Sequence, residues 1–183
     1  MTYKLLTSSL IAIATVVVGV NSVSIKPTEA VELANGQRAF VKAPRLVRSA
    51  ATFRSKNNPA STYQFTIEVP ENAGEALKAV KISQKNKIDT IVFKGNKSRA
   101  AEGENMAGVT IPLASIGGES QPGETTVVFD TPIEPGNTVT IAVKPQSNPS
   151  TGGIYLFGVT AYPTGENSPG MYLGSGRIDI SQD

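Results

Sequence analysis

Short runs of β-branched and aromatic residues, separated by loops rich in Pro, Gly and Asn, constrain the fold of this chain more than any other feature. Residues 62–69 (TYQFTIEV) alternate between apolar and polar side chains, which is typical of a strand with one buried face. Residues 125–129 and 138–143 are further β-rich runs. Between them, residues 131–137 (TPIEPGN) predict a rigid reversal, because Pro fixes φ and Gly accepts a positive φ.

The rest of the chain follows the same pattern, with almost no helical periodicity. Further strands are predicted over residues 38–41, 80–84, 88–93, 154–162 and 171–180, and an edge strand over residues 109–116. Residues 46–53 form a mixed segment. We also expect one helical turn over residues 75–79 and a loop over residues 94–105. Gly174 and Gly176 predict a bulge or a close backbone approach in the last strand. The run at 154–162 is apolar on both faces, which predicts a central strand.

These runs predict an all-β fold. We expect a single antiparallel β-sandwich, immunoglobulin-like in style, with at most one or two short helical turns.

The first thirty residues have the layout of a secretory signal peptide. Lys4 precedes an apolar run over residues 5–20, and a small-residue exit ends at Ala30. The run is interrupted by four hydroxyl residues and is shorter than the ~20 apolar residues of a membrane-spanning helix. We therefore expect residues 1–30 to be a cleaved signal peptide and residues 31–183 to form one domain. The protein is expected to be exported, to the periplasm or outside the cell, with no stable membrane span after cleavage.

The chain contains no cysteine, histidine or tryptophan. Without histidine it cannot build a Ser-His-Asp triad or a His-ligated zinc or iron site. Without cysteine it has no disulfide and no lipoprotein anchor. Chemistry based on paired carboxylates, Ser or Lys stays open, as do metal sites with oxygen ligands. We expect a protein that is not an enzyme, with no catalytic residues, no cofactor and no bound metal.

Charge is divided unevenly along the chain. Residues 33–99 hold 13 Lys or Arg and four Asp or Glu, whereas residues 100–183 hold two and nine. Strands from the two halves could interleave so that the charges neutralise one another. Alternatively, a basic face could meet an anionic partner such as an envelope polymer, with Arg45, Arg48 and Arg54 as its contact residues. Aromatic residues are too sparse in the basic half to indicate nucleic-acid binding.

Three weaker signals remain. Tyr162 and Tyr172 flank the loop at 163–170 and would line a shallow ligand patch there. Residues 102–105 (EGEN) place oxygen ligands close together, as calcium prefers, although a solvated acidic loop is the favoured interpretation. Residues 96–98 (NKS) match an N-glycosylation acceptor.

Four segments carry a family resemblance. They are residues 43–47 (APRLV), 69–75 (VPENAGE), 152–166 (GGIYLFGVTAYPTGE) and 172–178 (YLGSGRI). With these, the chain resembles a cyanobacterial family of secreted proteins, domain-of-unknown-function family 2808, over residues 38–180. The resemblance implies a cyanobacterial origin, export to the periplasm or beyond, and no established activity, and it supplies no catalytic residues.

The sequence therefore favours an exported, non-enzymatic binding or structural module associated with the cell envelope. A periplasmic carrier or sensor of a small ligand or metal ion is the alternative, and a hydrolase is third. The oligomeric state is left open.

Overall fold

The computed structural model describes residues 31–32, 36–86, 88–114 and 121–181. The expected signal peptide, residues 1–30, lies outside them. The strands are β1 (Val31–Glu32), β2 (Arg38–Ala39), β3 (Arg45–Ala51), β4 (Tyr63–Glu68), β5 (Leu77–Gln84), β6 (Arg99–Glu102), β7 (Thr110–Ile111), β8 (Glu124–Ile133), β9 (Thr138–Val143), β10 (Gly153–Pro163) and β11 (Met171–Ile180). In the described ranges the helical content is one 3-10 turn, η1 (Gly95–Lys97).

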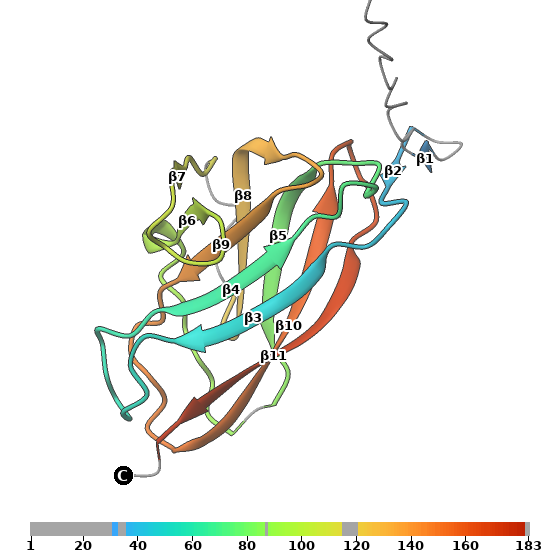
Figure 1. Cartoon of the computed structure of the whole chain (residues 1–183). Helices are drawn as coiled ribbons and strands as arrows, with labels where there is room; N and C mark the ends of the chain where they lie inside the picture. The colour runs from blue at the N-terminus through green and yellow to red at the C-terminus, as the bar shows by residue number, and fades with distance from the viewer. Residues whose placement is uncertain (1–30, 33–35, 87, 115–120, 182–183) are drawn as a thin grey trace, which may run out of the picture.

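Two antiparallel sheets are stacked in a sandwich (Figure 1). One sheet has four strands in the order β11-β10-β5-β8, and the other has five in the order β3-β4-β9-β6-β7. A separate hairpin pairs β1 with β2. The predicted all-β sandwich with minimal helix is confirmed, and neighbours in each sheet come from distant parts of the sequence.

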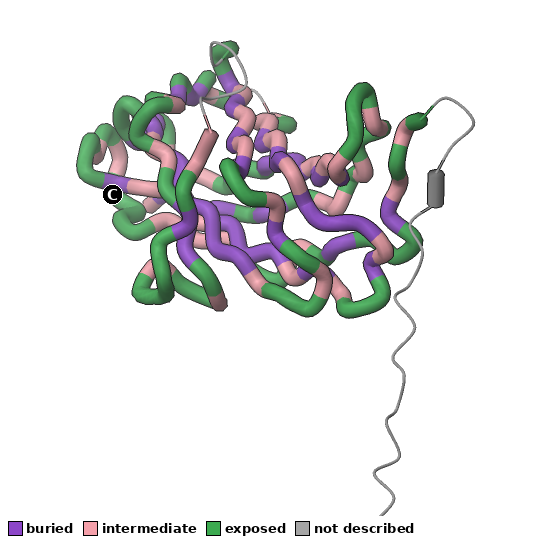
Figure 2. Tube along the Cα trace, turned by 90° about the horizontal axis from the view of Figure 1, so that it is seen from above, coloured by how far each residue is buried: buried purple, intermediate pink, exposed green. Residues whose placement is uncertain are grey.

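The alternation seen in the sequence fills the space between the sheets. The residues of β4 and β9 that face inward are fully buried, namely Tyr63, Phe65, Ile67, Val139, Ile141 and Val143. From the opposite sheet Phe157 enters the centre of this core, where its ring lies 5.5 Å from Tyr63, 5.9 Å from Phe65 and 6.2 Å from Phe93. Buried segments therefore run through the middle of the molecule and exposed ones lie around it (Figure 2).

Strands β3 and β11 close one side of the sandwich, although they belong to different sheets. The Ser49 hydroxyl donates to the Arg177 carbonyl at 3.1 Å, and the two strands lie side by side in Figure 1. Gly176 allows this approach, since a Cβ there would lie 2.8 Å from Ser49 Cβ. The predicted close backbone approach in the last strand thus joins β11 to β3.

Several details of the strands match the expectations. β10 lies between β11 and β5, so it is central, and β7 is an edge strand followed by Pro112. The β10–β11 register shifts between Val159 and Thr160. Opposite this shift Gly174 has a φ of 115°, so the predicted bulge is present.

Two predicted elements are wrong. The helical turn at residues 75–79 is absent, because β5 begins at Leu77 and buries Leu77 and Ala79 on alternate positions. Residues 88–93 form no regular strand. Ile91 and Phe93 do point into the core, but the backbone N–H of Ile91 donates to the side-chain Oε1 of Gln84 at 3.0 Å. The Gln84 side chain therefore takes the place of a neighbouring strand at Ile91, and Phe93 pairs with Pro145 as an isolated bridge.

The predicted loop at residues 94–105 is also wrong in part. It contains η1 and then β6, which pairs with β9 through Ala100 opposite Ile141. β6 carries two alanines in place of the large β-branched residues that mark a strand. This strand places Arg99 on the outer face of the five-stranded sheet.

Candidate functional site

The outer face of the five-stranded sheet carries a row of polar and small residues. Tyr63 and Phe65 point into the core, so their neighbours Thr62, Gln64 and Thr66 point outward. Gln64 lies opposite Ala142 of β9, and Ala142 lies opposite Arg99 of β6. Arg99 and Gln64 therefore flank the small Ala142 on the same face.

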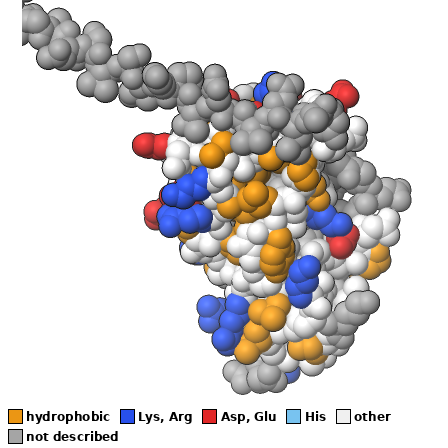
Figure 3. All heavy atoms as spheres, turned by 90° about the vertical axis from the view of Figure 1, so that its right-hand side faces the viewer, with side chains coloured by type: hydrophobic (Ala, Val, Ile, Leu, Met, Phe, Trp, Pro, Cys, Tyr) orange, Lys and Arg blue, Asp and Glu red, His pale blue; other side chains and the backbone are white. Residues whose placement is uncertain are grey.

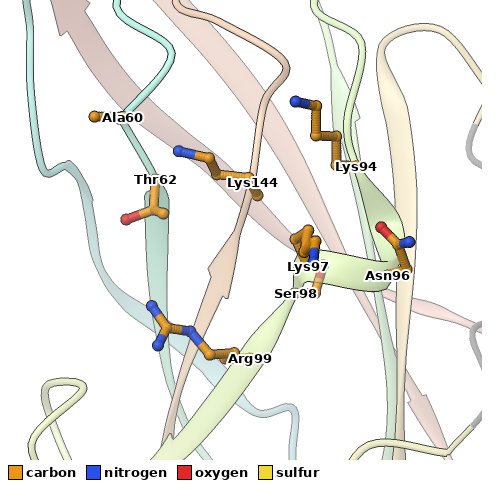
Figure 4. Close-up of a pocket in the computed structure, with 8 residues that line it drawn as sticks. All are labelled: Ala60, Thr62, Lys94, Asn96, Lys97, Ser98, Arg99 and Lys144. Atoms are coloured by element: carbon orange, nitrogen blue, oxygen red, sulfur yellow. The ribbon is translucent and has the colours of Figure 1, made fainter.

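A hollow of about 530 Å³ opens beside this row, and we call it the basic pocket. Its lining residues are Ala60, Thr62, Lys94, Asn96, Lys97, Ser98, Arg99 and Lys144. Figure 4 shows Arg99 extending from β6 toward β4 and Thr62, with Lys144 and Lys94 above it. Four of the eight lining residues are cationic and none is acidic, so the pocket concentrates positive charge.

Backbone contacts bring these cations together. Lys144 directly follows β9, and its carbonyl accepts from the backbone N–H of Lys94 at 2.7 Å. The Lys144 ammonium donates to the carbonyls of Pro59 and Ser61 at 2.6 and 2.8 Å. Lys144 thus holds the loop before β4 in place as one wall of the pocket.

The other three cations are available to a ligand. The side chains of Lys94, Lys97 and Arg99 form no ion pair or hydrogen bond with any described residue and are exposed. The Ser98 hydroxyl is buried, also without a partner in the described part of the chain. Neighbouring cations repel one another, and an anion bound in the pocket would relieve the repulsion among Lys94, Lys97 and Arg99.

A second hollow of about 430 Å³ lies on the same face, and we call it the mixed hollow. It is lined by Val47, Arg48, Thr66, Glu104 and Asn105. Thr62 lines the basic pocket and Thr66 lines the mixed hollow, so Gln64 stands between them. The Arg48 guanidinium donates to Gln64 Oε1 at 3.2 Å, which leaves the Gln64 amide hydrogens without a partner among the described residues.

The arginines predicted as contact residues lie in three different settings. Arg45 of β3 is paired with Glu68 at 2.6 Å, and Arg48 lines the mixed hollow. Arg54 is exposed beyond the end of β3, and its carbonyl accepts from the Ser181 backbone N–H at 2.8 Å. Arg45 begins β3 whereas Arg54 lies beyond its other end, and only Arg48 lines one of the two hollows, so the three do not converge on one hollow.

The predicted aromatic residues lie on the outer face of the other sheet. The Tyr172 ring packs on the backbone of Gly158, and its hydroxyl is 2.7 Å from Ser175 Oγ. Lys85 Nζ lies 5.3 Å from the centre of this ring. Tyr162 packs separately, against Gly170. On the β10 and β11 side of the molecule, hydrophobic side chains form a band with Lys and Arg along its margins (Figure 3). Neither Tyr162 nor Tyr172 lines the basic pocket or the mixed hollow.

The acidic loop has a structural role. The carbonyls of Gly103 and Glu104 accept from the hydroxyls of Thr140 and Thr66, at 2.8 and 3.4 Å, and Asn105 Oδ1 caps the following turn at Ala107. In the described residues no group of three Asp or Glu side chains is placed to hold a metal ion.

Sequence reasoning missed the basic pocket. The sequence places Lys94, Lys97 and Arg99 in the basic half, but it does not show that η1, which follows Lys94, and β6, which begins at Arg99, bring them to one hollow. Lys144 belongs to the acidic half. It lies beside these cations because its carbonyl accepts from the backbone N–H of Lys94, fifty positions away in the sequence. The signal that could have found them is the close spacing of three cations with no acidic residue between Lys94 and Arg99.

Within the described residues, no helix combines the length and apolar character needed to span a bilayer.

The fold and this face together define a β-sandwich domain with a cationic hollow on one sheet. The chain belongs to the family described as "Protein of unknown function (DUF2808)", whose sequence profile matches residues 37–180. No curated protein matches it.

Among solved structures, the chain is similar to the collagen-binding domain of a Staphylococcus aureus adhesin, with 8% identity, a TM-score of 0.34, and coverage of 65% of this chain and 87% of that one. It is also similar to the C-terminal domain of the Streptococcus pyogenes antigen I/II-family protein AspA, with 12% identity, a TM-score of 0.39, and coverage of 83% and 45%. At these identities the likeness concerns the fold alone.

Proposed function

We propose that the protein is an exported, non-enzymatic module that binds an anionic polymer of the cell envelope through the basic pocket. The observation that carries the proposal is the convergence of Lys94, Lys97, Arg99 and Lys144 on one hollow without an acidic lining residue. Export is supported by the signal-peptide layout of residues 1–30.

The chemistry of the pocket suits carboxylate, sulfate or phosphate groups. An Arg guanidinium presents a planar set of donors that matches such oxyanions, and Lys adds point charges around them. Asn96 and Thr62 add neutral polar groups at the rim. Several weak contacts to successive units of a polymer would add up, because each later contact forms within the same molecule.

The test measures binding of the purified protein to immobilised anionic polysaccharide at low and high salt. Arg99→Gln is expected to lower the affinity about tenfold, the effect of losing one hydrogen bond to a charged group. Added salt should weaken binding by the unchanged protein, because the pocket is open to solvent.

The matched control is Arg177→Gln, which removes the same charge from the other sheet, where Arg177 faces Asp179 at 3.7 Å. Equal losses in the two variants would mean that net charge, and not the basic pocket, drives binding. An affinity that changes neither with added salt nor in the Arg99→Gln variant would refute the proposal.

A further inference from the structure

We propose that the ligand is an acidic polysaccharide in which a charged sugar alternates with an uncharged one. The charged unit would lie in the basic pocket and the uncharged unit in the mixed hollow. This inference rests on the proposed function and adds the chemical class of the polymer.

A ligand that occupies both hollows must be long enough to span the face between them. Thr62 and Thr66 line different hollows and are four residues apart on β4, which is about 13 Å along a strand. A single phosphate or sulfate ion would fill one hollow and leave the other empty. Gln64, between them, offers its free amide hydrogens to a chain that crosses the face.

The two hollows differ in charge. The basic pocket has four cations and no carboxylate, whereas the mixed hollow has one cation, Arg48, and one carboxylate, Glu104. The net charge of the mixed hollow is therefore close to zero, and its lining includes donors and an acceptor side by side.

That combination suits sugar hydroxyls. A hydroxyl donates one hydrogen bond and accepts others, so it can pair with the carboxylate of Glu104 and with the donors of Arg48 or Asn105. A second anionic unit would instead be placed beside the Glu104 carboxylate, and like charges at such a distance repel. A polymer charged at every unit, such as polyphosphate, is therefore the poorer fit.

The experiment compares two probes on the full-length purified protein. Hyaluronan oligosaccharides alternate a uronate with an uncharged N-acetylated sugar, and linear polyphosphate of matched total charge carries a charge at every unit. Calorimetry should give the tighter dissociation constant for hyaluronan.

Glu104→Gln separates the two ligand classes. We expect it to weaken hyaluronan binding about threefold to tenfold, because a neutral amide oxygen accepts a weaker hydrogen bond than a carboxylate, and to strengthen polyphosphate binding by removing a repulsive charge. Asp130→Asn is the matched control, because it removes an exposed carboxylate from β8 in the other sheet and should change neither. Circular dichroism melts confirm that both variants are folded.

The outcomes distinguish this inference from the proposed function. If Glu104→Gln strengthens binding of both probes, or if polyphosphate binds the unchanged protein more tightly, the alternating glycan is wrong while the basic pocket stands. If Arg99→Gln leaves binding of both probes unchanged, the basic pocket is not the site, and both proposals fall.

Discussion

The backbone N–H of Lys94 donates to the carbonyl of Lys144 at 2.7 Å, which places two lysines from opposite halves of the chain beside one hollow. Their side chains differ in the contacts that they make. Lys144 Nζ donates to the carbonyls of Pro59 and Ser61, whereas the Lys94 side chain is exposed and makes no bond to any described residue.

Replacing these lysines should therefore separate stability from binding. Lys144→Met is expected to lower the free energy of unfolding by about 1–2 kcal/mol, because two backbone carbonyls lose a charged donor. Lys94→Met should leave unfolding unchanged within about 0.5 kcal/mol. Both should weaken binding of anionic polymer. Urea unfolding and calorimetry measure the two quantities, and equal stability of both variants would contradict the assigned difference.

The structure leaves no room for a side chain at Gly176. An added Cβ would lie 2.8 Å from Ser49 Cβ and 3.0 Å from Phe65 Cε1, so Gly176→Ala is expected to destabilise the protein by about 1–3 kcal/mol through overpacking. Urea unfolding measures this loss.

The control for Gly176→Ala is its combination with Ser49→Gly, which removes the nearer obstacle. The double variant should lose less than the sum of the two single variants, as residues in contact are not additive. Additive losses would show that Ser49 and Gly176 do not limit each other.

Asp89 should make the protein sensitive to acid. The Ser150 backbone N–H and hydroxyl both donate to its carboxylate at 2.9 Å, and these bonds hold the pKa of Asp89 below its ordinary value of 3.8. A carboxyl whose pKa is lower in the folded state contributes stability above its unfolded pKa, and this contribution is lost as the pH falls through the folded pKa.

Asp89→Asn tests that linkage. The difference in unfolding free energy between the unchanged protein and the variant should be constant at neutral pH and should shrink as the pH falls below 3.8. Urea unfolding across a pH series measures it. A difference that does not change over this range would exclude Asp89 as the titrating group.

Calcium should leave the melting temperature unchanged. The carbonyls of Gly103 and Glu104 are already bonded to threonine hydroxyls, and in the described residues no group of three Asp or Glu side chains is placed to hold a metal ion. An ion that binds the folded state raises its stability. A clear rise in Tm with calcium, reversed by a chelator, would instead favour the metal-carrier alternative.

Much of the fold was predictable because its strands carry their own signal. The alternation in β4 and the apolar run of β10 report burial directly, and Gly174 marks the bulge. β6 was missed because Ala100 and Ala101 are small and give no β pattern, although both are buried. The strand predicted over residues 88–93 is wrong because Ile91 and Phe93 alternate inward, whereas the backbone is bonded to a side chain at Ile91 and forms an isolated bridge at Phe93.

The site was harder to predict than the fold, since it depends on pairing across the sheet. Arg48 lines the mixed hollow beside the basic pocket, but nothing in the sequence reveals that Gln64 and Ala142 separate it from Arg99. The first half of the chain is basic and the second half acidic, but the basic pocket includes Lys144 from the acidic half.

The contact between β3 and β11 has a consequence for how the chain reaches this state. Among the described residues β3 is the first long strand and β11 the last, and they meet through the Ser49 hydroxyl and the carbonyl of Arg177. Contacts between such distant residues form late, because a long loop must close first. Because Ser49 and Arg177 are 128 residues apart, β3 has no partner on this side of the sandwich until the ten residues of β11 have been synthesised.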